Sequence, residues 1–206
     1  SMHQEDTLAE LIRYLAQSEA LLSFSLANKN RRPLLIALQA FAFLREVIRG
    51  PNQSAISALV HHTELVELVR NFLRHLRYDG ELDDLKFRLR SSILMFLLTL
   101  LQNVDWSHER STKWTYHDCD EVVLELWQEA HQLTLQPVGS KRCGDSAIRG
   151  VGRAELEQQV FLHYAVLTYL AEASLSTTLP VKVAARHEAH SWCQKQCGSV
   201  EVLRGQ

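Results

Sequence analysis

The sequence has 206 residues, of which 46% are hydrophobic and 22% are charged. These fractions are typical of a globular protein, so they exclude a disordered or collagen-like chain. The net charge of −2 lacks the strong basic excess that marks a dedicated nucleic-acid-binding protein. Eight Gly and four Pro leave little material for the many tight turns of an all-β fold. We expect one helical domain across residues 1–206, because the length suits a single domain.

Apolar residues recur with helical spacing from the start of the chain. A first helix is predicted after the N-cap Asp6, running towards Leu26. Pro33 suits the first turn of a second helix, which we expect to end at Gly50-Pro51.

The next part of the chain predicts a short helix over Ser54–His61 and a fourth helix capped by Thr63. A fifth helix begins near Leu82, and its second half, Ile93–Leu101, is apolar on almost every side. A helix that is hydrophobic all round must be covered all round, so this half is expected at the centre of the fold. The second helix and a seventh helix (about Ala154–Leu175) share that character.

A sixth helix is predicted after Asp118, and an eighth from Pro180 to about Cys197. Strand patterns are nearly absent, since no hairpin signal lies between alternating residues. The predicted fold class is therefore all-α, with about eight helices in an antiparallel, layered arrangement. The core helices are expected roughly over residues 7–135 and 153–197.

Two connections are long. The segment Asp105–His117 holds Trp106, Trp114 and Tyr116, whose large rings are expected to pack down because they are costly to leave in water. The Gly-rich segment 136–152 is expected to be a mobile loop.

The triplet of a short helix (Ser54–His61), a medium helix (Thr63–Arg77) and a long apolar helix (Leu82–Val104) resembles an armadillo-type unit. It spans about 50 residues, close to the 40–47 of such repeats. The pattern is similar to an armadillo/HEAT-like helical repeat over Leu34–Leu175. That resemblance implies a binding scaffold that uses a concave surface for peptides or partner domains.

Four residues near the end of the sequence have the side chains that zinc prefers, but one helix cannot bring them to one ion. The two outermost residues would lie about 15 Å apart along the helix axis. We therefore predict no metal site and no cofactor. The alternative is a zinc site made of two of them with Cys119, Cys143 or His117. The four residues are His187, His190, Cys193 and Cys197.

A basic row lies on the fourth helix at Arg70, Arg74 and Arg77. Residues four apart share a helix face, so this row can meet an acidic peptide or a phosphate backbone. The alternative is an exposed helix face that is balanced by nearby acidic residues. Those acidic residues are Glu64, Glu67, Asp83 and Asp84.

No motif of an enzyme is present: the sequence has no Gly-x-Ser-x-Gly, no P-loop and no Rossmann glycine set. His61-His62 is expected to cap a helix or to be partly buried. Glu125 and Glu129 are four apart on a helix, which is typical of an exposed face rather than an acid/base pair. We therefore predict no catalytic residue, no enzymatic activity and no small-molecule substrate.

The predicted function is a non-enzymatic protein–protein interaction module, or scaffold domain, of a larger intracellular protein. The alternative is a nucleic-acid-associated helical repeat that uses local basic patches for a weak contact. The expected partner is a protein or peptide, because aromatic and Arg side chains carry most of the energy at interfaces. The predicted partner-binding residues are Arg70, Arg74, Arg77, Trp106, Trp114 and Tyr116.

The sequence also predicts an intracellular location, cytoplasmic or nuclear, with no membrane contact. Four Cys are too few for a disulfide scaffold in a chain of this length. The longest charge-free apolar runs are shorter than the roughly 20 residues that span a bilayer. These runs are Pro33–Leu44, Ser91–Val104 and Gln158–Ala171.

Overall fold

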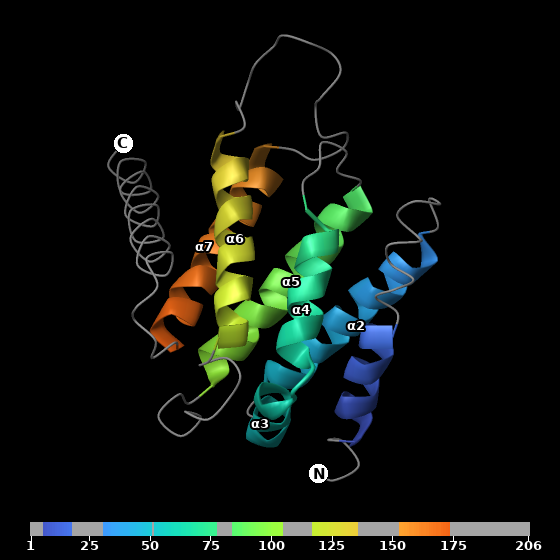
Figure 1. Ribbon diagram of the computed structural model, residues 1–206. Coiled ribbons are helices and arrows are strands. Elements are labelled where there is room, and N and C mark those ends of the chain that lie inside the picture. Colours follow the sequence, from blue (N-terminus) through green and yellow to red (C-terminus); the bar gives the residue numbers. More distant parts are fainter. Residues whose placement is uncertain are drawn as a thin grey trace, which may run out of the picture.

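The computed structural model (Figure 1) describes residues 6–17, 31–50, 52–77, 84–104, 117–135 and 153–173. Across these ranges the regular structure is helical and there is no strand, so the predicted all-α class is confirmed. Seven helices lie in the described ranges. The first covers residues 6–17, and the others are α2 (Arg32–Ile48), α3 (Gln53–His61), α4 (Leu65–His75), α5 (Asp84–Asn103), α6 (His117–Leu135) and α7 (Arg153–Ala173).

Several sequence predictions fall outside the described residues. They are the eighth helix, from Pro180 to about Cys197, the loop at 136–152, and the end of the first helix beyond residue 17. Residues 105–116 of the predicted aromatic loop are also outside, while His117 already begins α6.

Local chemistry explains the starts of α2 and α3. Pro33 lies in the first turn of α2, as predicted, because its fixed φ suits that position. The side chain of Asn52 caps α3, since its Oδ1 accepts a hydrogen bond from the Ala55 N–H at 3.2 Å. The prediction that Thr63 caps α4 is wrong. Thr63 lies in a turn, and the N-cap position belongs to Glu64, which makes no side-chain cap hydrogen bond.

The helices form two layers (Figure 1). α4 and α6 lie side by side in one layer and run in the same direction. In the other layer α5 lies between α2 and α7, and these three helices run opposite to α4 and α6. α3 joins the end of α2 to the start of α4 and contacts both α2 and α5.

Aromatic side chains from the two layers pack against one another. Phe41 of α2 meets the ring of Phe72 of α4 edge-on at 5.4 Å, and it lies 5.8 Å from the ring of Phe96 of α5. All three rings are fully buried. Edge-to-face pairs of this kind stabilise a core by about 0.5–1.5 kcal/mol beyond the area that they bury.

α5 is the central helix, as the sequence predicts. No residue from Ser91 to Leu101 is exposed, because α2, α3 and α7 pack around it and Phe96 contacts the core on the remaining side.

The expectation that α2 and α7 are covered all round is wrong. Leu35, Ile36 and Phe43 of α2 are 38–51% exposed, and Phe161 of α7 is 44% exposed. In the described part of the chain, α2 and α7 are the outer helices of their layer, so each has a side that no described helix covers. None of the described helices combines the length and the apolar character needed to cross a bilayer.

Candidate functional site

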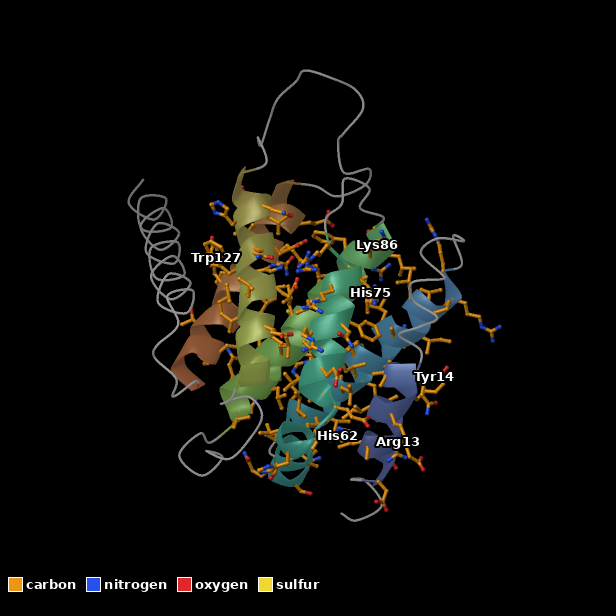
Figure 2. The ribbon with its side chains drawn as sticks, in the orientation of Figure 1. Arg13, Tyr14, His62, His75, Lys86 and Trp127 are labelled. Carbon is orange, nitrogen blue, oxygen red and sulfur yellow. The ribbon has the colours of Figure 1, made fainter. Side chains whose placement is uncertain are left out.

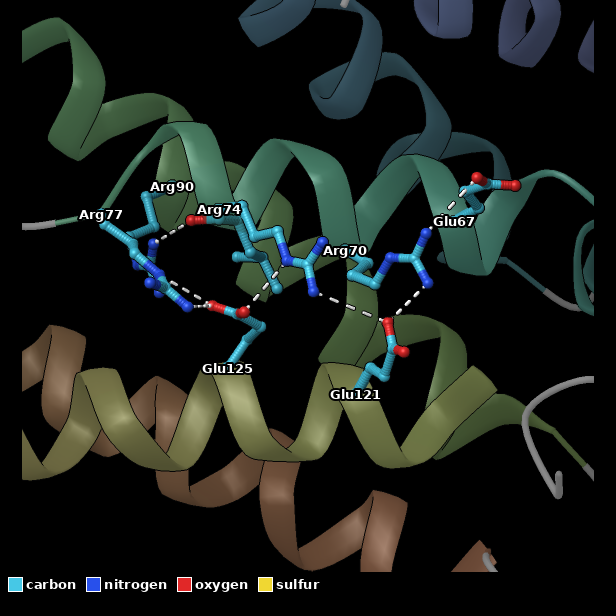
Figure 3. A network of polar contacts seen from close by, with 8 residues as sticks. Glu67, Arg70, Arg74, Arg77, Arg90, Glu121 and Glu125 are labelled. Atoms are coloured by element: carbon cyan, nitrogen blue, oxygen red, sulfur yellow. Dashed lines mark hydrogen bonds and ion pairs between the residues drawn. The ribbon is translucent and has the colours of Figure 1, made fainter. Parts of the chain in front are cut away.

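The basic row of α4 lies against acidic residues of α6 (Figure 3). Arg70 NH1 donates to Glu121 Oε2 at 2.6 Å, and Arg74 Nε donates to Glu125 Oε1 at 3.1 Å. Arg77, just beyond the end of α4, donates from Nε to Glu125 Oε2 at 2.9 Å. We call these five residues the α4–α6 ladder.

The ladder follows from matched spacing on two helices that run in the same direction. Arg70 and Arg74 are four residues apart, as are Glu121 and Glu125. One ion pair between the two helices therefore forms at each successive helix turn. The hydrogen bond to Glu125 raises the pKa of Arg77 above its ordinary value, because it favours the charged form. The arginines are thus balanced mainly by α6 and, at Arg70, by Glu67 at 3.4 Å.

The prediction that Glu125 and Glu129 mark an exposed face is wrong. Glu125 is 7% exposed and Glu129 is 2% exposed. Spacing within α6 could not reveal this, because the cations that allow their burial come from α4 and α5.

A buried polar cluster continues the ladder into the core. Arg90 of α5 is 1% exposed, and its NH1 donates to the carbonyl oxygens of Leu73 and Leu76 at 3.0 and 3.2 Å. The same NH1 lies 3.8 Å from Glu129 Oε1. Nε and NH2 lie 3.2 and 3.1 Å from Nε2 of His163 on α7. One guanidinium therefore links α4, α5, α6 and α7.

His163 is held neutral at this place. A guanidinium can only donate, so Nε2 of His163 is the acceptor and Nδ1–H donates to the Gln159 carbonyl at 2.7 Å. Burial and, next, the charge of Arg90 lower the pKa of His163 to about 3. With no exposed surface, the imidazole has no contact with solvent.

The opposite side of α5 borders a hollow of about 370 Å³, which we call the α5 groove. α2 and α7 form its walls and α5 its floor. Its apolar lining comes from all three helices, namely Leu38, Phe87, Met95 and Leu162. Ser92 also lines the groove. It follows Arg90 by two residues, which places it roughly 200° around the helix and thus away from the buried cluster.

Charged residues also line the α5 groove. Asp84 and Arg88 of α5 and Glu155 of α7 belong to the first two turns of their helices, whereas Arg45 lies in the last turn of α2. Arg88 is exposed and makes no ion pair with another described residue. Sequence reasoning missed this groove, since it depends on which helices become neighbours.

The other predicted partner residues, Trp106, Trp114 and Tyr116, lie outside the described residues, so their predicted role is untested. The same holds for the four zinc candidates His187, His190, Cys193 and Cys197 and for Cys143. Among the described residues, no three His, Cys, Asp or Glu side chains come together as a metal site would require.

His62 is the C-cap residue of α3 (Figure 2), and its Nδ1 accepts a hydrogen bond from the Glu64 N–H at 3.4 Å. Burial is the main cause that lowers its pKa, and the charge of Arg13 on the first helix acts in the same direction. His62 thus agrees with the expectation for His61-His62, whereas His61 is exposed.

Comparison with known proteins gave no match: no family model, curated protein or solved structure is significantly similar to the chain.

Proposed function

We propose that this chain is a non-enzymatic protein–protein interaction module with an armadillo/HEAT-like arrangement of helices. The observation that carries the proposal is the α5 groove, which is lined by apolar side chains from three helices together with charged side chains of the same helices. Binding sites commonly combine these two features, because apolar burial supplies affinity and the charges supply orientation.

The helix arrangement supports the repeat architecture. In the consecutive pairs α4/α5 and α6/α7, the first helix lies in one layer and the second in the other (Figure 1). Stacking two-helix units in this way creates an extended surface formed by the second helices, here α5 and α7, and α2 lies beside α5 in the same layer. The α5 groove lies on that surface.

Exposed apolar side chains extend the proposed surface beyond the groove. Leu35 is 48% exposed and precedes the lining residue Leu38 by three positions, so both share a side of α2. Phe161 is 44% exposed and follows the lining residue Gln158 by three positions on α7. Exposed apolar groups next to a hollow are typical of an interaction surface.

The α4–α6 ladder is a weaker choice for the recognition surface. Arg70, Arg74 and Arg77 already bind Glu121 and Glu125, so a partner would have to compete with these ion pairs. The same pairing removes the main support for the nucleic-acid alternative, since the basic row is neutralised within the chain.

The test is photo-crosslinking in cells with benzoylphenylalanine at single positions. The probe replaces Ser92 in the groove or, as the control, Leu124, which is 38% exposed on α6 in the other layer. We expect a discrete protein adduct from position 92, its loss in a Met95→Glu background, and none from position 124. No protein adduct at position 92, or an adduct with nucleic acid instead, would contradict the proposal.

A further inference from the structure

The buried polar and charged side chains of the described ranges lie at one boundary of the fold. On one side of it are α6 and α7, which pack on each other and which we call the α6–α7 pair. On the other side are α2 to α5, which we call the α2–α5 block. Arg90 belongs to the block and meets Glu129 and His163 across the boundary. The buried polar residues of the pair are Glu125, Glu129, Gln159 and His163.

The contacts across this boundary are sorted by side (Figure 3). The block supplies the cations, namely Arg90 and the three arginines of the α4–α6 ladder, and α6 supplies the carboxylates that they meet. Ser91 of α5 also donates, from its Oγ to Gln159 Oε1 at 2.8 Å. In each of these contacts the block donates and the α6–α7 pair accepts, so the attachment depends on acceptors that lie on one side.

The core inside the block is apolar. Phe41, Phe72 and Phe96 come from α2, α4 and α5 and contact one another without a ring from the α6–α7 pair. Apolar side chains of the pair, such as Leu126 and Leu167, are also buried in the core. Apolar packing therefore holds the pair on the block as long as the charges at the boundary are matched.

Acid changes only one side of the boundary, because arginine keeps its charge. Protonation of Glu125 and Glu129 removes the negative charges that the arginines meet. Protonation of His163 places a second positive charge beside Arg90. Burial and, next, the charge of Arg90 lower the pKa of His163 to about 3, so below pH 6.5 a state in which His163 is exposed binds a proton that the docked state does not. In acid the boundary thus changes from matched charges to cations alone.

We infer that acid releases the α6–α7 pair from the α2–α5 block as a unit, while the block keeps its apolar core. α7 forms one wall of the α5 groove, so release of the pair also removes the groove. The fold therefore contains a pH-sensitive switch at the boundary between the two parts. This inference goes beyond the proposed function and does not depend on it.

Hydrogen exchange measured by mass spectrometry tests the order of release. The full chain is held at a series of pH values from 7 down to about 3, and the labelling time is scaled to the intrinsic exchange rate at each pH. We expect peptides from α6 and α7 to lose protection at a higher pH than peptides from α2 and α5. Between pH 7 and pH 5, His163 alone should lower the protection of α7 roughly 25-fold.

Two histidine variants separate the switch from a general loss of stability. His163→Gln keeps a side-chain oxygen that can accept from Arg90 but cannot take up a proton, so most of the fall in α7 protection between pH 7 and pH 5 should disappear. His131→Gln is the control, because His131 is an exposed residue of α6 whose ring stacks on Trp127 at 5.6 Å. Its α7 protection should fall as in the wild type.

Loss of protection at the same pH in all helices would overturn the inference, because the chain would then unfold as one unit. Earlier loss in α2 and α5 would overturn it as well. An equal fall of α7 protection in His163→Gln and in the wild type would show that this histidine is not part of the switch. If His163→Gln does not fold, the order of release in the wild-type chain decides alone.

Discussion

Arg90 and Arg88 lie two residues apart on α5 but in opposite surroundings. Arg90 is 1% exposed and binds two carbonyl groups and an imidazole beside α4. Arg88 is exposed at the edge of the α5 groove. One side of the central helix is thus closed by the polar groups of its own chain, whereas the other presents apolar and charged groups to solvent. Among the described residues, this asymmetry supports the proposal that a partner binds on the groove side of α5.

The largest expected effect comes from removing the buried cation. Arg90→Ala leaves Glu129 and the carbonyls of Leu73 and Leu76 without their donor, which should lower the free energy of unfolding by about 3–5 kcal/mol. Arg88→Ala is the matched control and should change it by less than about 0.5 kcal/mol. Urea unfolding monitored by circular dichroism measures both. Similar losses for the two variants would contradict the comparison.

The buried histidine makes stability depend on pH. The pKa of His163 is about 3 in the folded chain and about 6.5 when unfolded, so below pH 6.5 the unfolded state binds a proton that the folded state does not. The free energy of unfolding therefore carries no penalty from His163 well above pH 6.5, and it falls as the pH decreases from 6.5 towards 3. Between pH 7 and pH 5 this group should cost about 2 kcal/mol.

The variant His163→Gln isolates that contribution, because glutamine does not titrate. The difference in the free energy of unfolding between wild type and variant, measured by urea unfolding at each pH, should shrink from pH 7 to pH 5. A difference that stays constant would show that His163 does not titrate as the structure implies.

The ion pairs of the α4–α6 ladder should contribute less to the free energy of unfolding than the buried cluster does. The two carboxylates of the ladder should also contribute unequally. The Glu125 side chain is 8% exposed and accepts from Arg74 and Arg77, so Glu125→Gln should cost about 1–3 kcal/mol. Glu121 is 41% exposed, and Glu121→Gln should cost less than about 1 kcal/mol. Thermal unfolding in low and high salt measures both losses. A larger loss for Glu121→Gln would reverse the order that burial predicts.

The smallest effect is expected on the outer side of α2. Phe43 is 51% exposed, so Phe43→Ser should change the free energy of unfolding by less than about 0.5 kcal/mol. Phe41 is fully buried against Phe72 and Phe96, and Phe41→Ser is the contrasting variant that should unfold far more easily. Equal chemical-denaturation midpoints for the two variants would show that α2 is covered on both sides.

The helices were predictable because each carries its own periodic pattern. The central position of α5 could also be read from Ile93–Leu101, where apolar residues occupy every side. The positions of neighbours could not be read in this way. α2 looks equally apolar, but it lies at the outside of its layer, and only the fold decides which helix is outermost.

Side-chain contacts between residues far apart in the sequence could not be predicted for the same reason. Arg90 and His163 are 73 positions apart, and Arg74 and Glu125 are 51 apart, so no local spacing joins them. One sequence signal could have found the buried cluster. Arg90 shares a helix face with Ile93 and precedes it by three positions, so a cation lies on a side that is otherwise apolar.

The most direct test of the recognition side uses the methyl group of Met95, which lines the α5 groove. The chain has only two methionines, so a ¹³C-methyl-methionine NMR spectrum contains few signals, and Met95→Leu assigns the one from the groove. On titration with the partner identified by crosslinking at position 92, the Met95 resonance should shift as the complex forms. Binding of that partner with an unchanged Met95 resonance would place the recognition site elsewhere and contradict the account.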